Sequence, residues 1–317
     1  MTAFRLRFPS RTVAAILLSC LASLVAVTAT RAGIQGSGVR KVMAYGTISP
    51  GRALSVNGVT YDASGAQVVI NGEAADRSRL HVGHIVSIVG TVSSDDDNAI
   101  AVADQITLVS EVRGEITAVN AKKGTLEVLG QTVSVPAGVS GVERGMLVNV
   151  SGFPDADGVF HASSLEVESA QPFSQVKGVV RALDRDHAVL QVGDLAIDYS
   201  SAAVQGTIAE GVTVIAKGTS VGGSLPQFGL VASSVAVYTG LGEPGEKGDL
   251  EGIITSFASA EDFDVNGQPV RADADTKYLL HGTQLGANVQ VRVKGRFDTA
   301  GVLVANKVQA DKPPKKK

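Results

Sequence analysis

Residues 142–152 read VERGMLVNVSG, and the same skeleton recurs at residues 80–90, 208–218 and 285–295. In each stretch an aliphatic residue is followed at +3 by Gly or Asn, at +6 by Val and at +10 by Gly. A Gly-x-Ile or Gly-x-Val opening lies upstream of every copy, and an Ala-x-x-aliphatic pattern lies downstream. The chain therefore repeats a unit of about 60 residues four times. The shared positions are aliphatic, Gly or Asn, so architecture repeats and reactive side chains do not.

Strand signals dominate each unit. Residues 289–294 alternate apolar and polar side chains with period 2, as a half-buried strand does. Asn57-Gly58 and Asn266-Gly267 are typical of type I′ hairpin turns, which need positive φ at both residues. Gly130 and Gly193-Asp194 occupy the equivalent places in the other two copies. Before its last two strands, each unit has an aliphatic-x-x-Gly or aliphatic-x-x-Asn element, which predicts a single helical turn closed by a residue at positive φ.

These patterns predict an all-β chain of four tandem small β-barrel modules of the OB or SH3-like kind, following an N-terminal signal peptide. Modules this small bury little surface, so we expect neighbours to lean on each other. Aromatic residues make up only 4% of the chain, so the cores must be aliphatic. The predicted segments are the modules 43–111, 112–170, 175–238 and 250–310, a flexible Gly-rich linker at 239–249 and a basic tail at 311–317.

The N-terminus has the layout of a secretory signal peptide. Arg5, Arg7 and Arg11 precede an uncharged apolar run at residues 13–27, and Thr30-Arg31-Ala32 offers a small-x-small cleavage site. We expect residues 1–32 to be removed and the protein to be exported to the periplasm or cell envelope. An uncleaved membrane anchor is the alternative, although the apolar run is somewhat short for one.

Cys20, the only cysteine, suggests another alternative. Leu17-Leu18-Ser19-Cys20 loosely resembles a lipobox, in which Cys20 would become the lipidated first residue of an anchored lipoprotein. Apolar sequence continues beyond Cys20, however, whereas lipoproteins usually turn polar there. Cleavage after residue 32 would leave no cysteine, so no disulfide could form within the mature chain. It would also remove four Arg and no acid from a chain whose net charge is −3.

The chain resembles the bacterial family catalogued as domain of unknown function 5666. The resemblance rests on the phrases GEITAVN and LEVLGQTVSV, on FDVNGQPVRADADTKY, and on GTIS with LSVNGVTYD. It covers most of residues 43–310 and is clearest in modules one and four, while module three departs most. Residues 33–38 also resemble the lead-in common in that family. The resemblance implies an exported, repeat-bearing envelope protein, and it supplies no activity and no catalytic residues.

Several stretches match a functional motif only in part. Residues 240–245, GLGEPG, match the dinucleotide fingerprint in letters, but the fingerprint needs a helix directly after it. Asp95-Asp96-Asp97-Asn98 lacks the spaced ligands of a calcium loop. We interpret these as a linker and a solvated hairpin tip. Asp262, Asp264, Asp273 and Asp275 are interpreted as the wet face of a strand, and Ser224 lacks the nucleophile-elbow pattern.

The histidines do not form a repeated site. His81 and His84 flank Gly83, but zinc would need further ligands, and the mature chain offers no thiolate. His161, His187 and His281 occupy different module positions. We interpret all five as surface or rim histidines, and we expect no catalytic, cofactor or metal site.

Composition argues against nucleic acid as a partner. The body is acidic and lacks Trp, whereas OB-like nucleic-acid binders use basic grooves and stacking aromatics. The tail Lys312-Pro313-Pro314-Lys315-Lys316-Lys317 is expected to be solvated, with weak contact to anionic lipid as the alternative. The sequence thus favours a non-catalytic envelope protein whose modules bind or space other envelope components. The alternative is an uncharacterised hydrolase or metal-dependent enzyme in one divergent module.

Export with cleavage predicts that the native protein begins near residue 33, because basic, apolar and small-residue regions occur in signal order. Intact mass spectrometry of protein purified from its natural host measures this directly. Retention of residues 1–32 or a diacylglycerol on Cys20 would contradict the prediction.

Overall fold

The computed structural model describes residues 40–310 except 93–99, 137–140, 171–172 and 222–228. The predicted signal peptide with Cys20, the acidic residues 95–98, Ser224 and the basic tail lie outside this part. The described residues are all-β, with one 3₁₀ turn at Arg77–Arg79, which confirms the all-β part of the prediction. None of their helical segments is long and apolar enough to cross a membrane.

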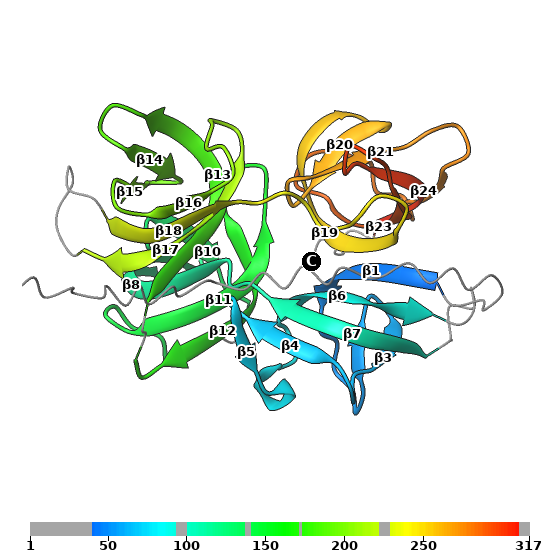
Figure 1. Ribbon diagram of the computed structural model, residues 1–317, viewed down its shortest axis with the longest axis horizontal. Coiled ribbons are helices and arrows are strands. Elements are labelled where there is room, and N and C mark those ends of the chain that lie inside the picture. Colours follow the sequence, from blue (N-terminus) through cyan, green and yellow to red (C-terminus); the bar gives the residue numbers. More distant parts are fainter. Residues whose placement is uncertain (1–39, 93–99, 137–140, 171–172, 222–228, 311–317) are drawn as a thin grey trace, which may run out of the picture. The chain divides into compact units, whose positions relative to one another are not determined.

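The strands fall into four consecutive groups (Figure 1). The first contains β1 (Arg40–Thr47), β2 (Leu54–Val56), β3 (Val59–Asp62), β4 (Gln67–Ile70), β5 (Glu73–Ala75), β6 (Ile85–Val92) and β7 (Ala101–Leu108). The second contains β8 (Val112–Asn120), β9 (Thr125–Val128), β10 (Gln131–Ser134), β11 (Leu147–Pro154) and β12 (Phe160–Glu168). The third contains β13 (Ser174–Asp184), β14 (Val189–Val192), β15 (Leu195–Asp198), β16 (Ala203–Gln205), β17 (Thr213–Ser220) and β18 (Leu230–Val237). The fourth contains β19 (Lys247–Ser259), β20 (Asp262–Val265), β21 (Gln268–Arg271), β22 (Lys277–Leu279), β23 (Gln290–Phe297) and β24 (Leu303–Ala310).

Five strands of each group close into a small barrel. In the last group β19 pairs with β20, β20 with β21, β21 in parallel with β24, β24 with β23, and β23 with β19. The second and third groups repeat this circuit strand for strand. In the first group an isolated bridge between Ile48 and Val56 completes the circuit. Closure leaves few unpaired edges on these aliphatic strands.

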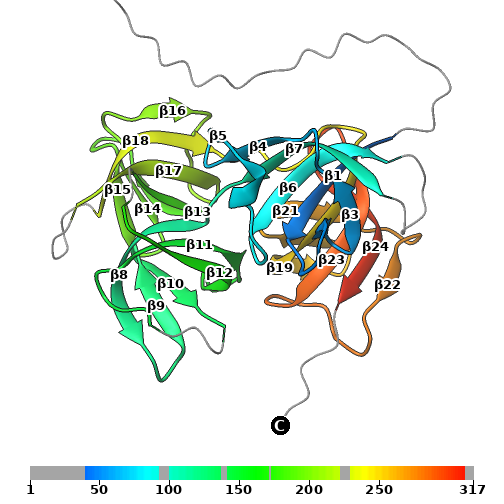
Figure 2. The same ribbon diagram turned by 90° about the horizontal axis from the view of Figure 1, so that it is seen from below.

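The barrels join edge to edge into two sheets (Figures 1 and 2). In one sheet β1 of the first barrel pairs in parallel with β19 of the fourth, with Val42 opposite Lys247. In the other, β8 and β13 pair antiparallel, with Val112 opposite Val176. The first strand of every barrel is therefore also the strand that joins it to a neighbour.

A recurrent turn explains the +3 position of the skeleton. Gly83, Gly145, Gly211 and Asn288 all have positive φ, between 68° and 91°, as predicted. The predicted helical turn is wrong, because a hydrogen bond from residue i+3 to residue i closes a β-turn, as from His84 N–H to the His81 carbonyl. Positive φ at its third position is typical of a type II turn, which favours Gly or Asn there.

This turn is tied to the first strand of its own barrel by two backbone hydrogen bonds. In the second barrel Gly145 N–H donates to the Ile116 carbonyl at 2.9 Å, and Ile116 N–H donates to the Met146 carbonyl at 2.8 Å. The same two bonds form in the other three barrels, where Ile48, Val180 and Ile254 take the place of Ile116. The aliphatic residue of the Gly-x-Ile opening therefore binds the turn through its main chain. We call this pair of bonds the turn lock.

The +10 glycine lies at a β-bulge. At Gly90, Gly152, Gly218 and Gly295 the pairing skips one residue of the following strand, and each glycine lies opposite the Ala of the downstream motif. A Cβ on these glycines would come within 2.5 Å of a backbone carbonyl oxygen. Only Gly fits such an approach, which accounts for Gly at +10 in all four copies.

The hairpin turns between the second and third strands agree with the sequence. Asn57-Gly58 and Asn266-Gly267 have positive φ at both residues, as type I′ turns require. Leu129 and Gly130 also both have positive φ. In the third barrel Gly193 has positive φ and Asp194 does not. These turns fold over the opening glycine, whose missing Cβ leaves room for the turn side chain, as at Gly252 beneath Asn266.

The cores are mainly aliphatic, with a few buried Phe and Tyr side chains, and they are shared between neighbours. One cluster of buried side chains runs through residues 112–237 and so serves the second and third barrels together. The core of the fourth barrel includes Met43, Tyr45 and Phe153 from other barrels. Residues of the predicted linker also pack, because β19 begins at Lys247 and Leu241 lies against this core.

The bulge predicts a sharp difference between two glycines of the fourth barrel. Gly295→Ala should lower the free energy of unfolding by about 2 kcal/mol, because the new Cβ would lie 2.2 Å from the Val304 carbonyl oxygen. Gly286→Ala is the control, since nothing lies within 4 Å of its Cβ position. Urea unfolding of both variants tests this. Equal effects would remove the steric explanation.

Candidate functional site

The first strands of the barrels bring polar residues into the joints. The residue before each opening glycine is Tyr45, Arg113, Lys177 or Glu251, and the residue two positions further back is Met43, Glu111, Gln175 or Asp249. Glu111, Arg113, Gln175 and Lys177 are all buried. Equivalent positions of the repeat thus carry the contacts by which one barrel recognises the next.

Glu111 and Lys177 form a buried ion pair where β13 pairs with the chain leading into β8. Lys177 Nζ lies 3.0 Å from Glu111 Oε1, and the Tyr45 hydroxyl donates to the same oxygen at 3.4 Å. Lys177 Nζ also lies 5.0 Å from the centre of the Tyr238 ring. Burial raises the pKa of Glu111 against the opposing attraction of Lys177. Burial acts to lower the pKa of Lys177, but the charge of Glu111 helps outweigh it, so that pKa is raised.

A cavity of about 280 Å³ lies beside this pair. Glu111 and Lys177 line it together with Asp155, Arg181 and Gln131. Its two acidic and two basic side chains balance, so the cavity has no net charge to select an anion or a cation. It has room for a few water molecules or one small polar molecule.

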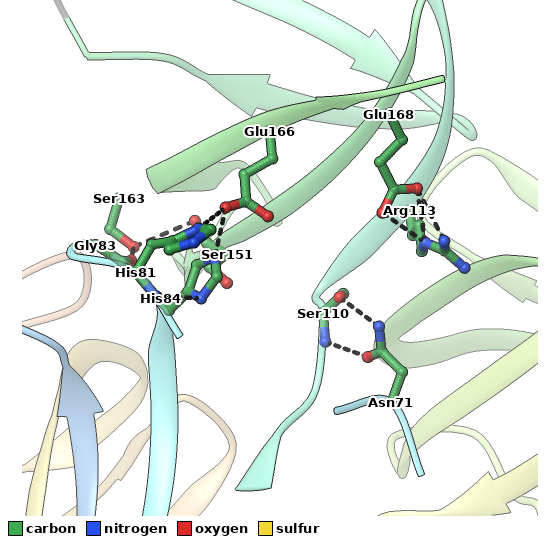
Figure 3. Close-up of polar contacts among 10 residues, drawn as sticks. All are labelled: Asn71, His81, Gly83, His84, Ser110, Arg113, Ser151, Ser163, Glu166 and Glu168. Atoms are coloured by element: carbon green, nitrogen blue, oxygen red, sulfur yellow. Dashed lines mark hydrogen bonds and ion pairs between the residues drawn. The ribbon is translucent and has the colours of Figure 1, made fainter. Parts of the chain in front are cut away.

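A hairpin of the first barrel makes a second polar joint. Asn71, buried at the turn between β4 and β5, donates through Nδ2 to Ser110 Oγ at 2.9 Å and accepts from Ser110 N–H at 2.8 Å (Figure 3). Its Oδ1 also accepts from Gln175 Nε2 at 3.2 Å, and its carbonyl accepts from Lys217 Nζ. One amide thereby connects the first barrel to the third.

Two histidines and a glutamate come together between the first and second barrels (Figure 3). His81 Nδ1 lies 2.5 Å from Glu166 Oε1, and His84 Nε2 lies 3.0 Å from the same oxygen. The two imidazole rings lie 5.2 Å apart between their centres. Among the described residues this is the one group of three metal-ligating side chains that converges. We call it the His-Glu cluster.

The elements around the cluster fix its members. His81 and His84 are the first and last residues of the recurrent turn, and Glu166 lies on β12. Ser163, the residue skipped at the β12 bulge, donates through Oγ to the Gly83 carbonyl at 2.6 Å and so attaches the turn to β12. Hydrogen bonds from His84 and then His81 lower the pKa of Glu166 to about 2, so its carboxylate is ionised at neutral pH.

The structure corrects the surface interpretation for one of these histidines. His84 is buried, with 3% of its surface exposed, while His81 is exposed. Glu166 supplies the third donor that the sequence did not reveal. His161 pairs with Asp155, His187 pairs with Asp184, and His281 is exposed at positive φ in a loop.

The other candidate motifs lie apart from these clusters. GLGEPG at residues 240–245 leads into strand β19 rather than a helix, so it lacks the dinucleotide-binding context. Asp262, Asp273 and Asp275 are exposed and Asp264 is half-buried. Burial, with the nearby charge of Asp262, raises the pKa of Asp264. Phe153 and Phe160 are buried in the cores.

Glu111, Lys177, Asn71 and Glu166 are residues that sequence reasoning missed. Asn71-Gly72 has positive φ at both positions and was a readable hairpin signal in VVINGEAA. Glu111 and Lys177 also had a signal, because other copies carry charged residues at the equivalent positions of their first strands. Asp249 is equivalent to Glu111, and Arg113 and Glu251 are equivalent to Lys177. Glu166 had no such signal, because its partner lies 85 residues away in another barrel.

The buried pair predicts a non-additive mutation cycle. Glu111→Gln or Lys177→Met alone should destabilise the protein by about 3 kcal/mol, because each leaves a buried charge unpaired. The double variant should recover most of that loss. Urea unfolding of the four proteins measures the coupling, and additive losses would show that the two groups do not act as a pair.

Comparison with known proteins places part of the chain in a family. No curated protein matches the sequence. The family model described as Domain of unknown function (DUF5666) matches residues 113–166 and 251–309. These segments fall in the second and fourth barrels, whereas the sequence likeness had been expected to be clearest in the first and fourth. The resemblance is confirmed: the chain carries in repeat the Domain of unknown function (DUF5666), at residues 113–166 and 251–309.

Proposed function

We propose that this protein is a non-catalytic, exported protein of the cell envelope whose tandem barrels bind or space other envelope components. One observation carries the proposal. The features that recur among the barrels are apolar core positions and backbone devices, namely the turn lock, the bulge glycine and the hairpin turn. A repeated enzyme would be expected to repeat a nucleophile, a base and a residue that orients them.

The proposal includes four domains. We assign them to residues 43–111, 112–170, 175–238 and 250–310, with a connection at 239–249 and a basic tail at 311–317. The parallel pairing of the third and fifth strands in each circuit favours an OB-type barrel over an SH3-like one.

The joints between barrels support a spacing role. Barrels joined through their first strands hold their outer surfaces at fixed separations, so several weak sites can act together on one partner. The partner is expected to be an envelope protein or polymer. The acidic body disfavours nucleic acid, and the basic tail offers at most weak contact with anionic lipid.

Localisation rests on the N-terminal layout. A signal peptide at residues 1–32 favours the periplasm or envelope, and lipidation of Cys20 is the alternative route to the same compartment.

A second function, a hydrolase or metal-dependent enzyme in one divergent module, is favoured by one observation. The His-Glu cluster occurs only once among the described repeats and brings ligating side chains together.

Cross-linked capture from intact cell envelope, with the full mature chain as bait, tests the proposal. We expect a discrete envelope partner, and we expect binding of the purified partner to survive His187→Ala, which alters an exposed histidine. Cytoplasmic extract is the control prey. Equal recovery from both extracts would contradict the envelope role, and substrate turnover abolished by one Asp or His substitution would establish the enzyme instead.

A further inference from the structure

We propose that His81, His84 and Glu166 bind a divalent transition-metal ion, with zinc as the best match, and that this ion joins the first barrel to the second. Two imidazole nitrogens and one carboxylate oxygen are the donors of a three-ligand zinc site that leaves a fourth position to water. Imidazole donors favour zinc and its neighbours in the first transition row over magnesium or calcium.

The two histidines lie in the recurrent turn that every barrel has, but only the first barrel has histidine at these positions. They occupy the first and last positions of the recurrent turn, and the equivalent pairs are Glu143 with Met146, Ala209 with Val212, and Gly286 with Val289. The turn lock is present in all four barrels, so the fold does not need histidine at these places. The pair therefore calls for an explanation beyond the architecture.

The turn and β12 hold the donors together independently of the imidazoles. Ser163 Oγ attaches the turn to β12 at the Gly83 carbonyl. A Cβ on Gly83 would lie 2.5 Å from the Ser163 carbonyl oxygen, so glycine at this position also permits the close approach. Glu166 lies on the same strand, three residues beyond Ser163. An ion entering the cluster would thus meet side chains whose main chains are already in place.

The spacing of the donor atoms suits a small ion. All three lie within 4.8 Å of one another. With metal–ligand bonds of about 2.0–2.1 Å, tetrahedral zinc holds its ligand atoms about 3.4 Å apart. His84 is fixed by burial, whereas 57% of the His81 side chain and 32% of the Glu166 side chain are exposed. Rotation of those two side chains opens the required space, and the exposed side admits the ion and its water.

The charges around Glu166 also favour a cation. Its carboxylate faces two imidazoles, whereas Glu168, two residues further along β12, is paired with the guanidinium of Arg113 at 2.9 Å. A neutral imidazole leaves the carboxylate charge largely uncompensated, and a divalent ion compensates it directly.

One hydrogen bond within the cluster works against metal binding and lowers the affinity for the ion. His81 N–H donates to His84 Nδ1 at 3.1 Å, which places the proton of neutral His84 on Nε2, the atom that faces Glu166. Binding through Nε2 must move that proton and break this bond, which lowers affinity by about tenfold.

Isothermal titration of zinc into the full mature chain, carrying no histidine tag, tests the proposal. We expect one zinc ion per chain, and His81→Ala or Glu166→Gln should weaken this binding by at least about 100-fold. His187→Ala is the matched control, because it removes an exposed histidine that also lies 2.8 Å from a carboxylate. That variant should bind zinc as the unaltered chain does.

Thermal unfolding with and without zinc separates a metal site from a hydrogen-bonded contact. Zinc should raise the unfolding temperature of the unaltered chain and of His187→Ala, but not of the other two variants. A contact held by hydrogen bonds alone would lower stability in those two variants without any dependence on zinc. The proposal is overturned by that result, by the absence of a bound ion, or by an affinity that Glu166→Gln leaves unchanged.

Discussion

The turn lock is the contact on which each barrel depends. It holds the first strand against the start of the fourth at one fixed point, and the register of the remaining pairs follows from there. The turn residue whose N–H donates in the lock has positive φ, so this position accepts Gly, or Asn as at Asn288. With one bond in each direction, the lock also satisfies main-chain groups that would otherwise be buried without partners.

Because the turn lock fixes the strand register, the packing of core side chains does not have to determine it. Most core positions hold Val, Ile, Leu or Ala, with a few Phe and Tyr among them, and a barrel of about 60 residues gains little stability from so small an interior. Shared cores supply the difference, since Phe153 of the second barrel packs into the fourth. The buried charges in the joints make a different contribution. An ion pair such as Glu111 with Lys177 adds little net stability, but it penalises any arrangement in which the wrong strand edges meet.

The sequence predicted what is local and repeated, and it missed what joins one copy to another. Positive φ at Asn57 or Gly145 follows from short-range sterics, and four copies make such a position stand out. The partner of Glu166 cannot be found that way, because the first barrel differs from the others at His81 and His84, and differences are invisible to a search for repeats. The pairing of β1 with β19 was hidden for another reason: edge strands of similar barrels have nearly the same pattern, so nothing local says which two meet. The predicted helical turn failed because a β-turn and a helical turn place residues three apart at similar distances.

The pairing of the first barrel with the last has a consequence for synthesis. A ribosome completes residues 40–108 long before residues 247–250 emerge, yet the edge of β1 is covered only by those residues. Until then Met43 and Tyr45, which end in the core of the fourth barrel, face solvent beside an open strand edge. Such an intermediate is prone to pair with another nascent chain. On the proposed export in an unfolded state, this exposure would be postponed until the whole polypeptide is present.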